Sequence, residues 1–188
     1  MPTNPFFAVV AAIAVYGVIL FNRLVKSRQL TREGWSGIDV QLKRRADLVP
    51  NLVEAVKGYA GHERALFDEI ARLRAQVGRL ADSDVAGRGQ LEGALSGTLK
   101  QLMALAEAYP DLKASGNFRD LQKALATVED EIQMARRYYN GATRNLNVLV
   151  ESFPSNLVAR SFGFHPRDYF EIGEPDRAVP EVAFAPSR

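Results

Sequence analysis

Few residues in this sequence could carry catalytic chemistry. The histidines are His62 and His165, and there is no cysteine, which excludes disulfides, thiolate zinc sites and cysteine nucleophiles. His62 and Glu63 form one His-Glu pair, but a zinc protease needs HExxH and a di-iron bundle needs several such pairs. A phosphate-binding glycine loop and a GxSxG motif are also missing. The sequence predicts a non-enzymatic protein without metal or cofactor; an enzyme would require an unrecognised pocket with convergent polar groups.

Polar residues at helical spacing offer a second kind of chemistry, the binding of a partner. Asp39 and Lys43 are four residues apart, and Arg44 and Asp47 are three apart, so each pair can lie on one helix face. As solvated ion pairs they would contribute roughly 0.3 kcal/mol each. The alternative is a partner-binding stripe, whose candidate residues are Asp39, Lys43, Asp47, Asn51 and Glu54.

Tyr138, Tyr139 and Asn140 form another polar group further along the chain. Tyr139 falls in the apolar register of its helix, whereas Tyr138 and Asn140 point elsewhere. Packing with one buried hydroxyl hydrogen bond explains this group without a function. The functional hypothesis adds Tyr138 and Asn140 to the candidate partner-binding residues.

An apolar stretch, residues 5–21, precedes these groups and carries no charge. As a helix it would rise about 25 Å, slightly less than a hydrocarbon core of about 30 Å. Leu24 and Val25 extend it if Arg23 snorkels to the interface. A core helix would show a polar stripe, and a cleaved signal peptide would carry basic residues before the apolar part and a small-residue site after it. The stretch lacks these features and predicts one uncleaved membrane span.

The basic residues after the span set its expected orientation. Positively charged flanks stay in the cytoplasm, so we expect the N-terminus outside and the remaining domain on the cytoplasmic side of the membrane. The same residues could also touch anionic lipid, at about 1 kcal/mol each near the surface. The candidate lipid-contacting residues are Arg23, Lys26, Arg28 and Arg32. The net charge of +2 does not indicate a nucleic-acid binder.

Apolar residues recur every three or four positions over residues 35–80, which is typical of a bundle helix. The pattern continues across Pro50, so it predicts one long helix with a kink there, running on from the membrane span. The alternative is a break at Pro50, with Asp47 capping a second helix. Gly34 and Gly37 are the expected points of flexure between span and bundle.

Further helices are predicted beyond a turn at residues 81–90, which is rich in Gly, Asp and Ser. They cover residues 91–109, 118–153 and, more briefly, 155–163. Short connections make neighbouring helices antiparallel. The predicted fold class is all-α: an N-terminal transmembrane helix, then an antiparallel up-and-down four-helix bundle with an extended C-terminal tail. The expected domains are residues 1–22 (short N-terminus and span), 23–34 (basic juxtamembrane segment), 35–164 (bundle) and 165–188 (tail).

The tail, residues 165–188, carries four prolines and no helical period. We expect it to lie extended on the bundle, anchored by Tyr169, Phe170, Ile172, Val182 and Phe184. Apolar positions that the tail does not cover could serve a second subunit, so the oligomeric state stays open.

Arg45 and Glu63 interrupt the apolar register of residues 35–80. They would lie about 27 Å apart on a straight helix, so they cannot pair with each other. Such charges more often fix helix register than bind a ligand. Their candidate partners on the 118–153 helix are Glu129, Asp130, Glu131, Arg136 and Arg137.

Several long motifs in this chain resemble those of the LemA family. The first is WSGIDVQLKRRADLVPNLVEAVKGYAGHE, residues 35–63. The later ones are YPDLKAS (109–115), ARRYYN (135–140), FPSN (153–156), FGF (162–164) and PEVAF (180–184). The resemblance covers essentially the whole chain and implies a bacterial protein with one N-terminal membrane helix, an outside N-terminus and a helical-bundle domain. It implies no catalytic residues.

These features together predict a membrane-anchored interaction or scaffold module for membrane or envelope maintenance. Its expected partner is a membrane-associated protein, and the resemblance makes a protease one candidate class. The alternative is an anionic-lipid-surface organiser that uses the basic juxtamembrane segment.

Overall fold

A computed structural model of the protein describes residues 5–81 and 84–172. Within these ranges all regular structure is helical, which confirms the all-α prediction. The helices are α1 (Pro5–Lys57), α2 (Arg64–Val77), α3 (Val85–Glu107), α4 (Pro110–Ala114), α5 (Gly116–Glu151) and α6 (Ser155–Ser161).

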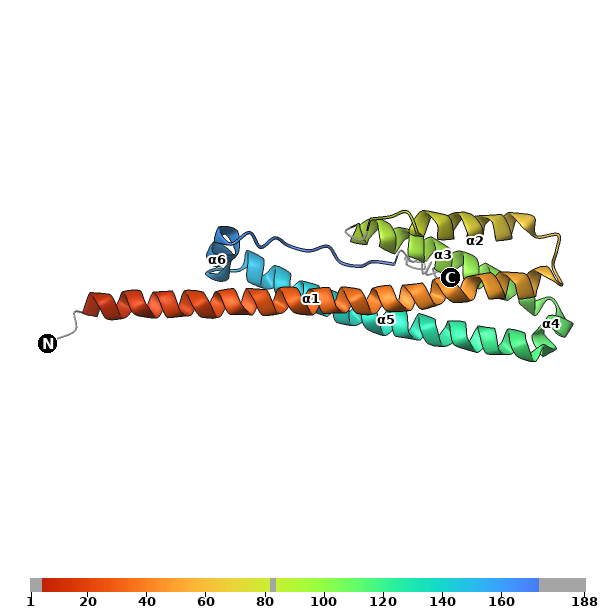
Figure 1. Ribbon diagram of the computed structural model, residues 1–188, viewed down its shortest axis with the longest axis horizontal. Helices are drawn as coiled ribbons and strands as arrows, with labels where there is room; N and C mark the ends of the chain where they lie inside the picture. Colours follow the sequence, from red (N-terminus) through yellow and green to blue (C-terminus); the bar gives the residue numbers. More distant parts are fainter. Residues whose placement is uncertain (1–4, 82–83, 173–188) are drawn as a thin grey trace, which may run out of the picture.

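Helix α1 is one continuous helix of 53 residues, about 80 Å long. It includes the apolar stretch, the basic segment and the first bundle helix, and Figure 1 shows it as the longest element of the molecule. The helix runs through Pro50, so the predicted alternative of a break is wrong. Pro50 has no N–H to donate, but its neighbours Val49, Leu52 and Val53 are buried, and their packing holds the helix together there.

The prediction of one bundle helix over residues 35–80 is wrong at its C-terminal end. Helix α1 stops at Lys57, and α2 starts at Arg64. Gly58 and Gly61 lie in the intervening turn, since glycine weakens a helix and favours its termination. Glu63 is exposed at the start of α2, so it needs no buried partner.

The predicted turn at residues 81–90 is also too long. Helix α3 begins at Val85 because Asp84 caps it: the Asp84 carboxylate accepts a hydrogen bond of 2.9 Å from the Gly87 N–H. Such an N-cap satisfies a backbone donor that the first helical turn leaves free. The glycines at 87 and 89 therefore lie inside the helix rather than in the turn.

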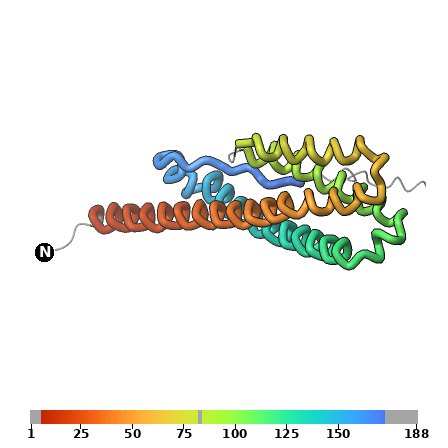
Figure 2. Tube along the Cα trace, turned by 45° about the vertical axis from the view of Figure 1, so that its right-hand side comes forward, coloured from red at the N-terminus to blue at the C-terminus, as the bar shows by residue number. Residues whose placement is uncertain are grey.

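The helices form an elongated rod with alternating directions. Helix α2 runs back from the end of α1, α3 reverses again, and α5 returns along α1 (Figures 1 and 2). Helix α5 packs mainly on α1, whereas α2 packs mainly on α3. Helix α6 lies beside α1, and the N-terminal part of α1 extends beyond it (Figure 1).

Gly34 lies at the close approach of α1 and α5. A Cβ atom added there would be 3.0 Å from the Tyr139 Cα atom and 3.1 Å from the Tyr138 ring, whereas one added at Gly37 would meet nothing within 4 Å. The helix passes through both glycines without interruption. Gly34 therefore serves packing, and flexure at Gly34 and Gly37 stays a prediction.

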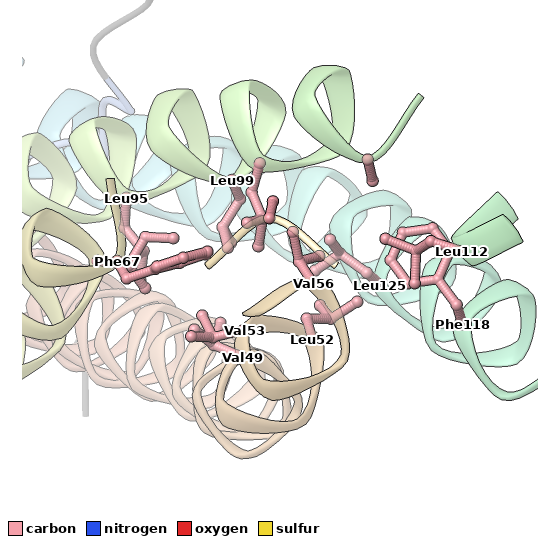
Figure 3. Close-up of a cluster of buried hydrophobic side chains, with 14 of the residues drawn as sticks. Val49, Leu52, Val53, Val56, Phe67, Leu95, Leu99, Leu112, Phe118 and Leu125 are labelled. Carbon is pink, nitrogen blue, oxygen red and sulfur yellow. The ribbon is translucent and has the colours of Figure 1, made fainter. Parts of the chain in front are cut away.

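The largest apolar cluster lies at the end of the rod far from the N-terminus, where α1 to α5 all contribute (Figure 3). Its labelled members are Val49, Leu52, Val53, Val56, Phe67, Leu95, Leu99, Leu112, Phe118 and Leu125. A second cluster surrounds Ile38 and Tyr139, and a third surrounds Leu24 and Phe164. The core thus extends along the bundle as far as the end of the apolar stretch.

The N-terminal part of α1 stands outside this core. Its apolar window has a mean hydropathy of 2.1, and only 11% of the window is buried. By length and composition it can cross a membrane. Its exposure separates it from the core helix of a soluble protein, which would bury an apolar stripe.

Candidate functional site

Two asparagines of α5 hold the segment that follows α6. Asn140 donates to the Phe170 carbonyl at 3.1 Å and accepts from the Phe170 N–H at 2.9 Å. Asn147 likewise donates to the Arg167 carbonyl at 2.9 Å and accepts from the Arg167 N–H at 2.8 Å. Each side-chain amide satisfies the donor and acceptor of one extended residue. We call these four residues the asparagine clamp.

Aromatic residues complete the attachment of this segment. The Tyr139 hydroxyl donates to the Asp168 carbonyl at 2.9 Å, and burial raises the pKa of Tyr139. Trp35 packs its ring on both Tyr139 and Phe170, with centroids 5.5 and 5.6 Å away. Because Gly89 of α3 has no side chain, the segment after α6 can approach α3 closely: a Cβ atom at Gly89 would collide with the Glu171 carbonyl.

The structure therefore gives several predicted residues an internal role. The amide of Asn140 binds the chain's own tail, and Tyr139 is buried with the one hydroxyl bond that was expected. Phe170 is fully buried and Ile172 packs on the same cluster, while Tyr169 stays exposed. The other expected anchors, Val182 and Phe184, lie outside the described residues.

Sequence reasoning missed Asn147. The sequence feature that could have identified Asn147 is its position seven residues, or two helical turns, after Asn140. This spacing puts both amides on one face of α5. An asparagine pair at that spacing beside an extended proline-containing segment indicates a backbone clamp.

Arg45 is fully buried at the centre of a charged cluster that joins three helices. Its Nη1 donates to Glu129 of α5 at 2.8 Å and to the Ser96 hydroxyl of α3, and its Nη2 pairs with the Glu92 carboxylate of α3. The predicted partner Glu129 is confirmed, whereas Glu92 was missed because it follows the weak apolar pattern of α3. The cluster stabilises the register of α1, α3 and α5, since each buried charge needs its partner.

The buried position of Glu92 destabilises the charged form of its carboxyl group. Burial raises the pKa of its carboxyl group, and the nearby charges of Arg45 and Arg88 oppose that shift. Because the pKa is raised, the folded state binds the Glu92 proton more tightly than the unfolded state does.

The polar stripe of α1 divides between two surfaces. Asp39 pairs with Arg88 of α3 at 2.6 Å, and Arg44 pairs with Glu131 of α5 at 2.6 Å. The predicted pairs of Asp39 with Lys43 and of Arg44 with Asp47 are therefore wrong, because α3 and α5 bring these longer-range partners within reach. Asp39 and Lys43 border a hollow of about 370 Å³ towards α2 and α3.

Asp47 and Asn51 instead face the groove between α1 and α5. This groove has a volume of about 630 Å³ and is open to solvent. Its polar lining comes from Arg44, Asp47, Asn51, Asp120 and Lys123, and its floor from Leu48 and Val128. Charges of both signs over an apolar floor suit a polar peptide segment better than a small apolar ligand. We call it the α1–α5 groove.

The remaining predicted partner-binding residues lie outside the groove. Glu54 is exposed and pairs with Lys57 at 3.0 Å, which is a local pair on α1. Tyr138 is about half exposed, and its ring lies near Gly34 at the close approach of α1 and α5.

The predicted lipid-contacting residues follow the apolar stretch on α1. Arg23, Lys26 and Arg32 are exposed. Arg28 is half-buried, with its guanidinium 4.8 Å from the centroid of the Phe164 ring. Three of the four are therefore accessible to lipid headgroups, and the fourth is held by a cation–π contact with the segment after α6.

Metal chemistry finds no support in residues 5–81 and 84–172, where no three His, Cys, Asp or Glu side chains gather to hold an ion. His62 lies exposed in the turn between α1 and α2, and His165 lies exposed after α6. The two histidines therefore belong to different parts of the chain and do not form a common site.

Fold and surface together define an all-helical protein whose long first helix links it to a membrane and whose bundle carries an open polar groove. The family model described as "LemA family" matches residues 34–184. The chain belongs to the LemA family, as its motifs indicated.

Similar proteins align with most of this chain. The magnetosome protein MamQ 1 of Paramagnetospirillum magneticum (strain ATCC 700264 / AMB-1) is 26% identical, over 87% of this chain and 69% of its own length. The magnetosome protein MamQ of Magnetospirillum gryphiswaldense is 23% identical, over 86% and 70%. The protein LemA of Metamycoplasma hominis is 25% identical, over 92% and 81%.

Proposed function

We propose that this chain is a membrane-tethered interaction module whose α1–α5 groove binds a membrane-associated protein. The observation that carries the proposal is the groove itself. It is open to solvent, has a volume of about 630 Å³ and is lined by charged and amide side chains from two long helices. The side chains of Asp47 and Asn51 are exposed there and form no hydrogen bond or ion pair with another described residue. Their unused hydrogen-bonding capacity suits a partner.

The rigid connection to the apolar stretch supports this role. Helix α1 continues from the candidate span into the groove, so a partner in the groove would be held at a fixed distance from the bilayer. Neither LemA nor MamQ is known as an enzyme family, which supports a non-catalytic role. The proposed setting is membrane or envelope maintenance, with a membrane protease as one candidate class of partner.

Site-specific photo-crosslinking in living cells tests this proposal. A photo-reactive amino acid at Asn51 of the full chain should give a discrete crosslinked protein, and Asp47→Lys should abolish that product because it reverses a charge in the groove. The matched control places the probe at Glu107, which is exposed at the end of α3. A product that is equal at both positions, or that survives Asp47→Lys, would count against the groove.

The orientation is part of the proposal and rests on the basic residues after the apolar stretch. The bundle would lie in the cytoplasm, with the N-terminus outside. The chain has no native cysteine, so a cysteine at the exposed position Lys100 of α3 gives a clean reading. An impermeant thiol reagent should label it only after the inner membrane is opened; immediate labelling would place the bundle on the other side.

A second candidate function is the organisation of an anionic lipid surface. The exposed side chains of Arg23, Lys26 and Arg32 favour it, because they follow the apolar stretch directly. A chain that begins at Arg23 should then bind anionic vesicles, and binding should weaken with added salt. Binding that is absent or independent of salt would exclude this function.

A further inference from the structure

Helix α6 packs against the last part of the apolar stretch. The Phe162 ring lies 4.8 Å from the Phe21 ring between centroids, and the Phe164 ring lies 6.0 Å from it. Leu20 and Leu24 of α1 are 5% and 0% exposed, and Leu24 belongs to the cluster that includes Ala159 of α6. Figures 1 and 2 show α6 beside α1, at the N-terminal end of the bundle.

Three large apolar side chains of this region are exposed. Phe153, in the turn before α6, is 79% exposed, and Leu157 and Phe162 are 56% and 62% exposed. The residues that α6 buries are small, namely Ser155 and Ala159. A helix that meets water would bury its large apolar side chains and expose its small polar ones, so α6 is built for a different environment.

The length of the apolar stretch indicates that the environment of α6 is the membrane interface. A hydrocarbon core of about 30 Å takes about 20 helical residues, so a span that begins at Pro5 reaches the level of Leu24. Leu24 shares a cluster with Ala159 of α6, and the Phe162 ring packs on Phe21, so α6 lies at the boundary of that core. Arg23, Lys26 and Arg160 are exposed in the same region, where basic side chains meet lipid headgroups.

We propose that α6 and the turn before it form an interfacial membrane-contact element, which inserts Phe153, Leu157 and Phe162 into the bilayer that α1 crosses. Exposed large apolar residues with basic residues nearby are typical of elements that lie in the membrane interface. The contact continues the surface of the span, and it rests on the proposed span but not on the α1–α5 groove. A second contact beside the span would fix the angle at which the rod leaves the membrane.

Depth-dependent quenching on the full chain in lipid nanodiscs tests the proposal, because the chain has no native cysteine. Separate variants Leu157→Cys and Phe153→Cys carry an environment-sensitive fluorophore in bilayers of phosphatidylcholine and phosphatidylglycerol. Lipids with a spin label near the headgroup should quench both probes strongly, while aqueous iodide should quench them weakly. Val10→Cys is the control within the span. Met134→Cys on α5, where the native side chain is about as exposed as that of Leu157, is the control in water.

Three outcomes would overturn the proposal, each for a different reason. Quenching of the probes at 153 and 157 by iodide, as at 134, would show that α6 faces water. Shielding from both iodide and lipid would show that protein, such as a second copy of the chain, covers this face. A probe at Val10 that lipid does not quench would remove the span on which the proposal rests, whereas failure at 153 and 157 alone leaves the span intact.

Discussion

The two halves of α1 are one helix built for two environments. The half nearest the N-terminus exposes large apolar side chains such as Phe7, Ile13 and Val18 over residues 6–19. The other half buries a stripe that includes Ile38 and Val49 and exposes charged residues between them. No change in backbone structure separates the halves, so the distribution of side chains alone determines which half meets lipid and which meets protein.

The two ends of the bundle also differ in how they are held together. The distal end combines a cluster of leucine, valine and phenylalanine with the buried charges around Arg45. The end near the membrane depends on a close helix crossing at Gly34 and on the asparagine clamp. We therefore expect the loss of a charge to damage the distal end, and the addition of volume to damage the membrane-proximal end.

The largest expected effect is that of Arg45→Met. Arg45 is fully buried, and its removal leaves the Glu92 carboxylate without its partner, which should cost about 3–5 kcal/mol of unfolding free energy. The adjacent variant Arg44→Met is the matched control, because it breaks only exposed interactions, the pair with Glu131 and a hydrogen bond to Gln41, and should cost about 0–1 kcal/mol. Chemical unfolding of the full chain in detergent, followed by circular dichroism, measures both.

The second variant Glu92→Met, added to Arg45→Met, should recover part of the loss because it removes the unpaired charge. Equal losses for Arg44→Met and Arg45→Met, or no recovery in the double variant, would show that these charges do not hold the distal end together.

The next effect tests the membrane-proximal end by comparing Gly34→Ala with Gly37→Ala. A Cβ at Gly34 would be 3.0 Å from the Tyr139 Cα atom, so α1 and α5 must move apart, at about 1–3 kcal/mol. A Cβ at Gly37 meets nothing within 4 Å, and alanine there should add up to about 1 kcal/mol through helix propensity. Melting temperatures should therefore shift in opposite directions, and a rise for both variants would show that the crossing is not tight.

The sequence was sufficient to predict the helices and the apolar span, because periodicity and uncharged length are local signals. It misplaced the end of the first bundle helix, since the apolar register continues by chance from Val56 to Leu66 across the turn that contains Gly58 and Gly61. Long-range pairing was harder to predict. Arg88 pairs with Asp39, and Glu92 pairs with Arg45, across the contact between α3 and α1. The spacing of residues within one helix does not contain that information.

The smallest effect concerns pH and compares a buried carboxyl with an exposed one. Burial raises the pKa of Glu92 above its ordinary value of 4.5. Its contribution to stability is therefore complete below about pH 4.5 and is lost as the pH rises through the folded-state pKa. Glu92→Gln lacks this dependence, so the stability of the native sequence relative to the variant should fall as the pH rises above about 4.5.

Glu69 is the control, because a hydrogen bond from Arg72 lowers its pKa. Its contribution is present above its unfolded-state pKa and is lost as the pH falls through the folded-state pKa, so the comparison with Glu69→Gln should slope the other way. The slope should also be shallow, since solvent screens this exposed pair. Urea midpoints across the pH range measure both slopes. A rising slope for Glu92 would mean that attraction to Arg45 outweighs burial, and the charge cluster would then stabilise the distal end most at neutral pH.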